Sequence, residues 1–469
     1  MIKYKDKFSG ISNLSLTKIW LVVFIYSVCT AFLVQFVILP YVFPSLDNGE
    51  GLIKDMDPAL FNRIAVQLYD KIKTQGWGAW ELYPGENGQS IAGVVAAIYA
   101  LTIPKPWVLI PFNAALHATS SLLLFLIISF FISDRKKCLL AILPFVFYPT
   151  ATLWFTQIHK DGVFITGIFS FALGWIKLSR TQEWERKWFS SLQGYILIFA
   201  GVFLVWLMRP YCIKMLFSVA ILISIILSIA LLSKINLSSK SLFRGLCAVL
   251  LVWIPLTLIH PFLREQPFGL SIFAAKHSQQ HQQPQEPPEL QKPQQPAVDG
   301  HWASRFKKNI ENELKEDLNT IVFKRVGSAR TGGMSLIDSN VSFKRAVDYL
   351  IYLPRLIQIS FLAPFPNMWF TEGVTLESTI MRRVSAFEMM GVYFFLPFLP
   401  FAIWDLRKRV DFWIIMLFFA SMLLLFGFSI INIGTFYRIR YGFLMPFVSF
   451  GIVGFVLFLQ KLRKKSDCQ

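Results

Sequence analysis

The amino-acid sequence predicts an all-α polytopic membrane protein, with about ten membrane-spanning helices and further interfacial helices on the outer face. Of its 469 residues 55% are hydrophobic and 46 are Phe, and the mean hydropathy is +0.52. The hydrophobic residues fall in uncharged runs of about twenty, the length with which an α-helix crosses a hydrocarbon layer of ~30 Å. The short alternating segments of a membrane β-barrel do not occur, so the spans are predicted to be helical.

The placement of basic residues predicts the orientation. Lys and Arg cluster between apolar runs, as they do at the cytoplasmic ends of spanning helices, so the net charge of +18 does not indicate a nucleic-acid partner. Six clusters are expected in the cytoplasm together with both chain ends: 3–18, 135–137, 177–187, 234–244, 407–409 and 461–465. The spans consistent with them are 19–40, 108–133, 138–158, 163–178, 189–208, 211–232, 246–263, 387–404, 412–433 and 442–459. The expected location is the inner (plasma) membrane of a bacterial-type cell.

Two further apolar stretches, 90–104 and 346–370, do not fit as crossings, because each would invert every later basic cluster. The first is short for a bilayer, and the second contains Arg355 and three prolines. Irregular backbone at membrane depth is tolerated where protein or a wet cavity covers it. Both stretches are therefore predicted to be interfacial or re-entrant on the outer side.

Three regions follow from this threading. Residues 1–263 form an amino-terminal transmembrane module, whose first outer loop, 41–89, bears an amphipathic helix. Residues 264–345 form a long outer loop, in which the tract 278–297 holds eight Gln and five Pro, a composition that cannot build a core. Residues 346–469 supply the second interfacial segment and the carboxyl-terminal transmembrane helices.

The helix predicted in the first loop begins at an acidic residue. Asp57 precedes Pro58, a pair typical of an N-cap followed by proline at the first helical position. The apolar face of this helix consists of Leu60, Phe61, Ile64, Leu68 and Ile72. Such a helix is expected to lie on the outer leaflet. From spacing alone Asp57 is either a helix cap or a catalytic carboxylate.

The pattern Asp57-x-x-x-Phe61-x-x-Ile64-Ala65 resembles the first-loop motif of the GT-C glycosyltransferase superfamily: an acidic residue, an aromatic four later, then Ile-Ala. The superfamily includes protein O-mannosyltransferases, oligosaccharyltransferases and the aminoarabinose transferases that modify lipid A. The resemblance continues through 88–123 and 138–162, and it covers roughly the first 180 residues. The chain departs from the family between Lys73 and Lys105, where it has no Lys or Arg before its short apolar helix.

The resemblance implies transfer of a sugar from a polyprenyl-phosphate-linked donor to a glycan or lipid acceptor on the outer face. Asp57 would be the general base that takes the proton of the acceptor hydroxyl. Asp161, at the turn where the family carries a second acidic residue, would orient the acceptor or the neighbours of Asp57. The two acids could share a divalent metal, and no other cofactor is indicated. The alternative for His159, Lys160 and Asp161 is an interfacial cluster in which Lys160 snorkels and pairs with Asp161.

A carrier phosphate needs cations on the same side of the membrane. Arginines at outer helix ends oppose the usual charge bias, so they are either ligands of such a phosphate or snorkel to membrane lipids. The last outer turn, 434–441, carries two of them. The candidate substrate-binding residues are His159, Lys160, Arg209, Lys214, Arg355, Tyr437, Arg438 and Arg440.

Two other functions remain open. A polysaccharide polymerase or ligase would use polyprenyl-pyrophosphate-linked glycans, and it would also need outer arginines. A flippase or transporter would place ionisable residues in mid-span, whereas these spans are nearly free of them. Transfer chemistry at the outer surface predicts that Asp57, Asp161, Arg209 and Arg438 converge on one cavity.

Overall fold

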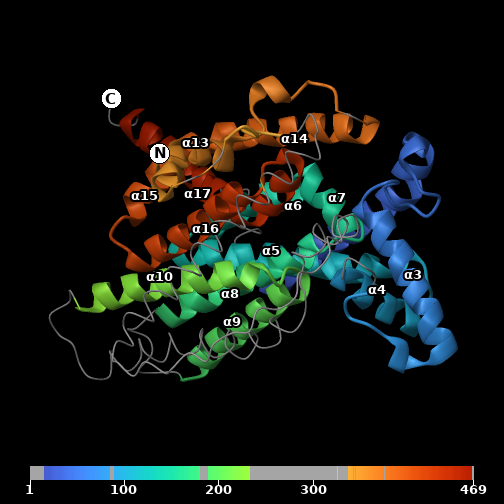
Figure 1. The fold of residues 1–469 in the computed structure, drawn as a ribbon. Coiled ribbons are helices and arrows are strands. Elements are labelled where there is room, and N and C mark those ends of the chain that lie inside the picture. Colours follow the sequence, from blue (N-terminus) through green and yellow to red (C-terminus); the bar gives the residue numbers. More distant parts are fainter. Residues whose placement is uncertain are drawn as a thin grey trace, which may run out of the picture.

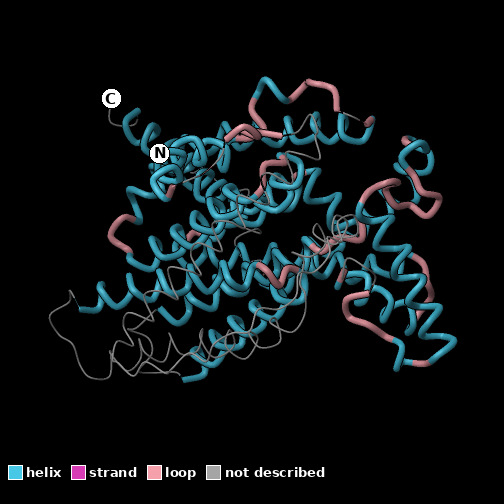
Figure 2. Tube along the Cα trace, viewed as in Figure 1, coloured by secondary structure: helices cyan, strands magenta, loops and turns pink. Residues whose placement is uncertain are grey.

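The structure is a computed structural model that describes residues 15–84, 89–179, 188–232, 325, 336–341, 343, 345–373 and 375–466. These residues are all-helical, and the two β-bridges among them, Asp47 with Ile53 and Leu336 with Asn432, are isolated. Figure 1 shows a bundle of long helices with α3 (Asp57–Gln75) and α4 (Ser90–Leu101) projecting at its right side. Figure 2 shows loops confined to the connections between helices. The all-α prediction is confirmed for this part of the chain.

The amino-terminal helices are α2 (Leu16–Leu33), η1 (Val34–Val42), η2 (Pro44–Leu46), α3, η3 (Trp77–Ala79), α4, η4 (Pro106–Leu109), α5 (Ile110–Phe131), α6 (Arg135–Phe147), α7 (Pro149–Thr156), α8 (Asp161–Ser179), α9 (Trp188–Met208) and α10 (Cys212–Leu232). The carboxyl-terminal helices are α13 (Ala346–Leu362), η5 (Pro366–Met368), α14 (Leu376–Phe395), η6 (Leu396–Phe398), α15 (Leu399–Leu406), α16 (Val410–Ser429) and α17 (Ile433–Ser466).

Within the described residues, five helical segments are long and apolar enough to cross a membrane: Leu16–Val42, Pro106–Phe131, Ser378–Leu406, Val410–Ser429 and Ile433–Arg463. The number rises to six if α6 and α7, which meet at 63°, count as one broken span. The bend follows from Pro149, which begins α7 and holds Tyr148 in an extended conformation. The predicted span 246–263 lies outside the described residues, so the number of ten remains a prediction.

Described basic clusters lie together at one end of the bundle. Lys137, near the start of α6, donates from Nζ to Oε1 of Gln460, near the end of α17, at 3.1 Å. Arg409, just before α16, lies over the ring of Phe131 at the end of α5, 4.7 Å from its centroid. Three of the six clusters predicted to be cytoplasmic, 135–137, 407–409 and 461–465, thus share one end of the described part of the molecule. The side of the membrane to which that end belongs remains a prediction.

Helices α8 and α9 pack closely because small residues face one another. A Cβ on Gly201 would lie 2.6 Å from the carbonyl oxygen of Gly167, and a Cβ on Gly174 would lie 2.7 Å from that of Gly194. Glycine lets two helix backbones approach in this way within a membrane. The same antiparallel register brings Asp161, which begins α8, beside the chain that follows the end of α9.

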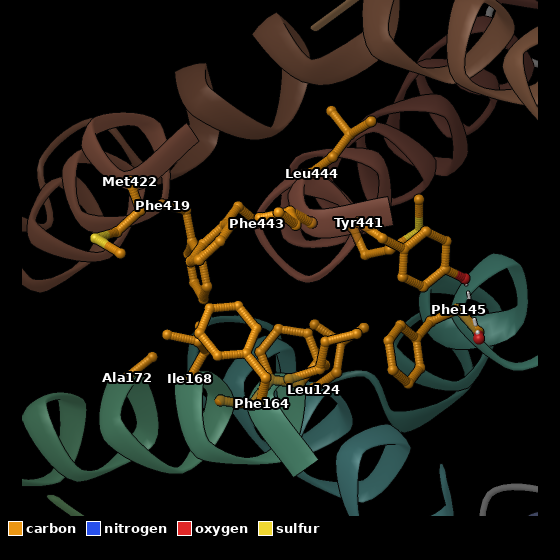
Figure 3. Packing of buried hydrophobic residues seen from close by; sticks show 14 of the residues in the cluster. Leu124, Phe145, Phe164, Ile168, Ala172, Phe419, Met422, Tyr441, Phe443 and Leu444 are labelled. Carbon is orange, nitrogen blue, oxygen red and sulfur yellow. Dashed lines mark hydrogen bonds between the residues drawn. The ribbon is translucent and has the colours of Figure 1, made fainter. Parts of the chain in front are cut away.

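Aromatic rings fill the space where α8, α16 and α17 meet (Figure 3). The ring centroid of Phe164 in α8 lies 6.4 Å from that of Phe426 in α16 and 6.0 Å from that of Phe443 in α17. Both pairs are edge-to-face, the arrangement that the ring quadrupole favours. The high Phe content of the sequence is thus used in part to hold the helices that carry the polar residues described next.

Helix α17 begins at Ile433, nine residues before the predicted span 442–459. The predicted outer turn 434–441 is therefore wrong, because these residues form the first turns of the helix. Since an α-helix has 3.6 residues per turn, Arg438 and Arg440 point about 200° apart around the axis. They consequently face different surroundings.

Candidate functional site

Asp57 is the first residue of α3, and its carboxylate pairs with Arg438. Met56 occupies the N-cap position without a side-chain hydrogen bond, so the predicted N-cap role of Asp57 is wrong. Oδ2 of Asp57 accepts from Nη1 of Arg438 at 2.7 Å. The side chains are 37% and 22% exposed, so the pair is still reached by solvent. The acid and the arginine that were predicted to converge do so.

Asp161 lies behind this pair and is buried. Its Oδ1 accepts from Nη2 of Arg209 at 2.6 Å, and its Oδ2 is 3.3 Å from Nε of Arg438. Burial acts to raise the pKa of Asp161, but Arg438 and Arg209 outweigh it and hold the pKa well below its usual range. Asp161 is therefore a buried anion that joins the two arginines. The predicted pairing of Asp161 with Lys160 does not form.

Arg209 follows the end of α9 and is 3% exposed. Its Nη1 donates to the hydroxyl of Tyr211 at 2.8 Å, and its guanidinium carbon lies 5.1 Å from the ring centroid of Phe164. These contacts hold the guanidinium rigidly against Asp161. Arg209 thus supports Arg438 through Asp161 rather than facing the solvent itself.

His159 and Lys160 directly precede Asp161, and burial lowers the pKa of both side chains. Burial, followed by the charge of Arg438, lowers the pKa of His159 to about 4, so its imidazole is neutral at physiological pH. Nζ of Lys160 donates to Oε1 of Gln89 at 3.1 Å and lies 5.6 Å from the ring centroid of Phe61. Burial and the charge of Arg209 lower the pKa of Lys160 to about 8.

Gln157 fixes the first loop beside the chain that leads into α8. Its Oε1 accepts from the backbone N–H of Ile53 at 3.0 Å, and its Nε2 donates to the carbonyl oxygen of Gly51 at 3.0 Å. Gly51 has φ +74°, and a Cβ there would lie 2.5 Å from the carbonyl oxygen of Gln35, so only glycine fits. This clamp sets the position of Asp57 relative to Asp161.

A cavity of about 490 Å³ opens beside Asp57. Four predicted site residues line it: Asp57, His159, Tyr437 and Arg438. The other lining residues are Ile53, Asp55, Met56, Thr150, Leu153, Trp154, Pro364, Met368, Ser378, Met381, Arg382, Ser385, Asn432, Ile433, Gly434 and Thr435. One part of the wall is thus charged, and another consists of Met, Leu, Ile, Pro and Trp side chains.

Other predicted binding residues lie elsewhere. Arg355 pairs with Asp338 through Nε at 3.0 Å and Nη2 at 3.1 Å. Arg440 is 1% exposed and donates to the backbone carbonyls of Ile359 and Ser360 in α13, so it joins α17 to α13. Lys214 belongs to α10, and its side chain lies outside the described part of the structure. The lining of the cavity includes none of the three.

Two residues that the sequence analysis missed belong to this region: Arg382 lines the cavity, and Glu388 bonds to two residues that line it. Arg382 of α14 lines it, and its Nη1 donates to Oγ1 of Thr371 at 2.7 Å. Glu388, also in α14, is fully buried and accepts from the backbone N–H of Thr150 and from the hydroxyl of Tyr437. An acid within an apolar helix is itself a signal of function, which the sequence offered at position 388. Glu388 is thus an exception to the statement that the predicted spans are nearly free of ionisable residues.

The two carboxylates proposed to share a metal are bridged by Arg438. The guanidinium lies between Asp57 and Asp161, with a charge-assisted hydrogen bond to Asp57 and an ion pair to Asp161. Among the described residues, no group of three or more His, Cys, Asp or Glu side chains is arranged to hold a metal ion. The cation that contacts both carboxylates in the structure is the side chain of Arg438.

No protein-family model matches the sequence, and neither a curated protein nor a solved structure matches the chain.

Proposed function

We propose that the protein is a membrane glycosyltransferase, which transfers a sugar from a polyprenyl-phosphate-linked donor to an acceptor at the cavity beside Asp57. The observation that carries this proposal is the pair of Asp57 with Arg438 on the wall of a 490 Å³ cavity. A carboxylate and a guanidinium side by side supply the two groups that such a transfer needs. One takes a proton, and the other stabilises the leaving phosphate.

In this proposal Asp57 is the general base. Its side chain is 37% exposed on the cavity wall, where the hydroxyl of an acceptor can reach it. The acceptor oxygen attacks the anomeric carbon of the donor sugar while its proton passes to Asp57. The bond from that carbon to the phosphate oxygen breaks, and the phosphate leaves with the electron pair. Arg438 and Arg382, both on the cavity wall, lie where they can balance its negative charge.

The apolar part of the wall supports a lipid-linked donor. Met381 lies on Ser378–Leu406, a candidate span. In the most apolar stretch of this span only 28% of the residues are buried inside the protein. Phe387, Met390 and Phe394 of the same span are exposed side chains. A cavity bordered by a helix of this kind suits a ligand with a polar head and a hydrocarbon tail.

A polymerase or ligase acting on pyrophosphate-linked glycans would use the same charges, and the identity of the product distinguishes it. A flippase without catalysis remains the alternative from another class. The grouping of Asp57, Asp161, Arg209 and Arg438 beside one cavity favours chemistry at that place over passage through the bundle. Flux in proteoliposomes without bond formation would instead support the flippase.

The test compares glycan product in membranes from cells that express Asp57→Asn, Arg438→Ala or the unchanged chain at matched levels. Loss of a general base lowers a rate by roughly 100-fold or more, and a similar loss is expected from Arg438→Ala. Asp70→Asn, which removes an exposed carboxylate from the same helix, is the matched control and is expected to keep full product. Normal product from both site variants would end the assignment.

A further inference from the structure

Arg438 has two carboxylate partners that differ in exposure. Its Nη1 donates to Asp57 at 2.7 Å, and its Nε lies 3.3 Å from Asp161. The side chain of Asp161 is 1% exposed, whereas that of Asp57 is 37% exposed. One edge of the guanidinium therefore faces the protein interior, and the other faces the cavity.

The interior partner is fixed and the cavity partner is exchangeable. Asp161 is held by Arg209, which is itself buried and bonded to Tyr211. Breaking a buried ion pair leaves an uncompensated charge, so Arg438 is expected to keep its contact with Asp161. An ion pair that solvent reaches, such as that of Arg438 with Asp57, contributes far less to stability. In the series of ion pairs Arg209–Asp161–Arg438–Asp57, the contact between Arg438 and Asp57 is therefore the easiest to break.

The charge of the cluster suits an additional anion. Arg209, Arg438 and Lys160 carry three positive charges against two negative charges on Asp57 and Asp161, while His159 is neutral. On the cavity wall Arg382 adds a further guanidinium and Asp55 a further carboxylate, so one positive charge remains in excess. The planar fork of an arginine pairs with carboxylate and phosphate oxygens in similar geometries. The position that Asp57 occupies at Arg438 is thus one that a phosphate oxygen can take.

We propose that the cavity-facing edge of Arg438 is a phosphate-binding position, which Asp57 holds until a phosphate displaces it. The identity of that phosphate as part of a sugar donor rests on the proposed function. In the empty cavity Asp57 is paired with Arg438, and binding of the donor releases the carboxylate of Asp57. The base becomes free for the acceptor hydroxyl only when the donor is present, so the acceptor proton is not taken before there is a sugar to transfer.

The experiment measures binding without turnover. The purified full chain in detergent is titrated with inorganic phosphate by calorimetry at constant ionic strength, with no acceptor present. Asp57→Asn is expected to bind inorganic phosphate about fivefold more tightly than the unchanged chain, since the partly exposed pair that competes with the ligand is lost. Asp57→Ser, which also lacks the charge, repeats the comparison independently of how well the first variant folds. An unchanged dissociation constant in both variants would overturn the exchange.

A matched control distinguishes displacement of Asp57 by phosphate from a general change in the electrostatic potential of the cavity. Asp55 lines the same cavity two residues earlier, and its φ of 58° is one that Asn tolerates. Asp55→Asn is expected to change phosphate affinity by less than about twofold, because a separated exposed charge is screened by salt. An equal gain from Asp55→Asn would show that only net charge matters, and the exchange would be wrong.

The dependence on Arg438 is tested in combination. Arg438→Gln is expected to abolish phosphate binding alone and together with Asp57→Asn. A gain that persists in the double variant would place the phosphate elsewhere and overturn the proposal. Farnesyl phosphate and farnesol distinguish the source of the phosphate. Tighter binding of farnesyl phosphate than of inorganic phosphate supports a lipid-linked ligand, whereas equal affinities support the exchange with a free phosphate and overturn the lipid source.

The result separates from that of the glycan assay. Loss of product in Asp57→Asn with unchanged phosphate affinity would leave Asp57 as the base and remove the exchange. Tighter phosphate binding with normal product would leave the exchange and remove the base.

Discussion

Arg438 in α17 donates a hydrogen bond to Asp57 in α3 across 381 positions of the sequence, at 2.7 Å. The pair joins the beginning of α3, in the first half of the chain, to α17, the last helix of the described residues. It also places a carboxylate and a guanidinium, which carry opposite charges, on the same cavity wall. Both residues lie near the start of their helices, so the register of two distant helices decides whether the site forms.

Asp161→Asn is expected to destabilise the protein by about 3–5 kcal/mol, because it leaves Arg209 buried and without its charged partner. The measurement is denaturant unfolding of the purified chain in detergent. Asp411→Asn, which breaks the more exposed pair with Arg409, is the control and should cost about 1 kcal/mol or less. Equal costs for the two variants would contradict the structural role of Asp161.

Phosphate affinity is expected to fall as the pH rises through about 8, because Lys160 then loses its charge. Its lowered pKa reflects burial and the charges of Arg209 and Arg438, opposed by those of Asp161 and Asp57. The proton is bound below pH 8 and released above it, so the cluster is more positive at lower pH.

Lys160→Arg keeps the charge throughout this range and should remove the decline. The measurement is the dissociation constant for inorganic phosphate between pH 7 and pH 9.5. A decline of the same size in the Arg variant would assign the titration to another group.

Gly201→Ala is expected to cost about 1–3 kcal/mol, since the added Cβ would meet the backbone of Gly167 and Phe171 at less than 3 Å. The helices α8 and α9 must then separate or slide, which also disturbs the contact of Asp161 with Arg209. Thermal unfolding with and without phosphate measures both effects. Gly78→Ala, where the new Cβ meets open space, should leave stability and binding unchanged within about 0.5 kcal/mol.

Glu388→Gln and Tyr437→Phe are expected to be non-additive. Glu388 accepts from Tyr437 and from the N–H of Thr150 at the start of α7, so it joins three elements of the cavity wall. A double-mutant cycle on the unfolding free energy should give a coupling of about 0.5–3 kcal/mol. Glu388→Gln with Thr150→Ser, which keeps the backbone N–H, is the control pair and should add simply.

Some of the charged residues of the site could be predicted from local patterns. Asp57 before Pro58 marked the start of a helix, and Arg209 and Arg438 stood out as arginines at helix ends that oppose the charge bias. The membrane-spanning character of several helices follows from their apolar length alone. These features depend on neighbours within a turn or two, or on the overall partition between water and lipid, both of which are visible in sequence.

Other features required distant parts of the chain. Arg438 and Arg440 are two residues apart and were assigned the same role, yet one lines the cavity and the other bonds to the backbone of α13. The difference arises because α17 begins at Ile433, and the helical rotation then separates them. Glu388 was missed because its partners, Thr150 and Tyr437, come from α7 and α17.

The sequence by itself determined the class of the protein, the apolar stretches that become helices and the residues able to carry charge at their ends. Those properties follow from the cost of exposing polar backbone to hydrocarbon, which each segment meets on its own. Only the tertiary structure decided which charges meet. The close packing of α8 on α9 sets Asp161 against Arg209, and the clamp at Gln157 sets Asp57 near Asp161, so that Arg438 of α17 contacts both carboxylates. Such pairings depend on register between helices, and register is decided by side-chain shape across the whole bundle.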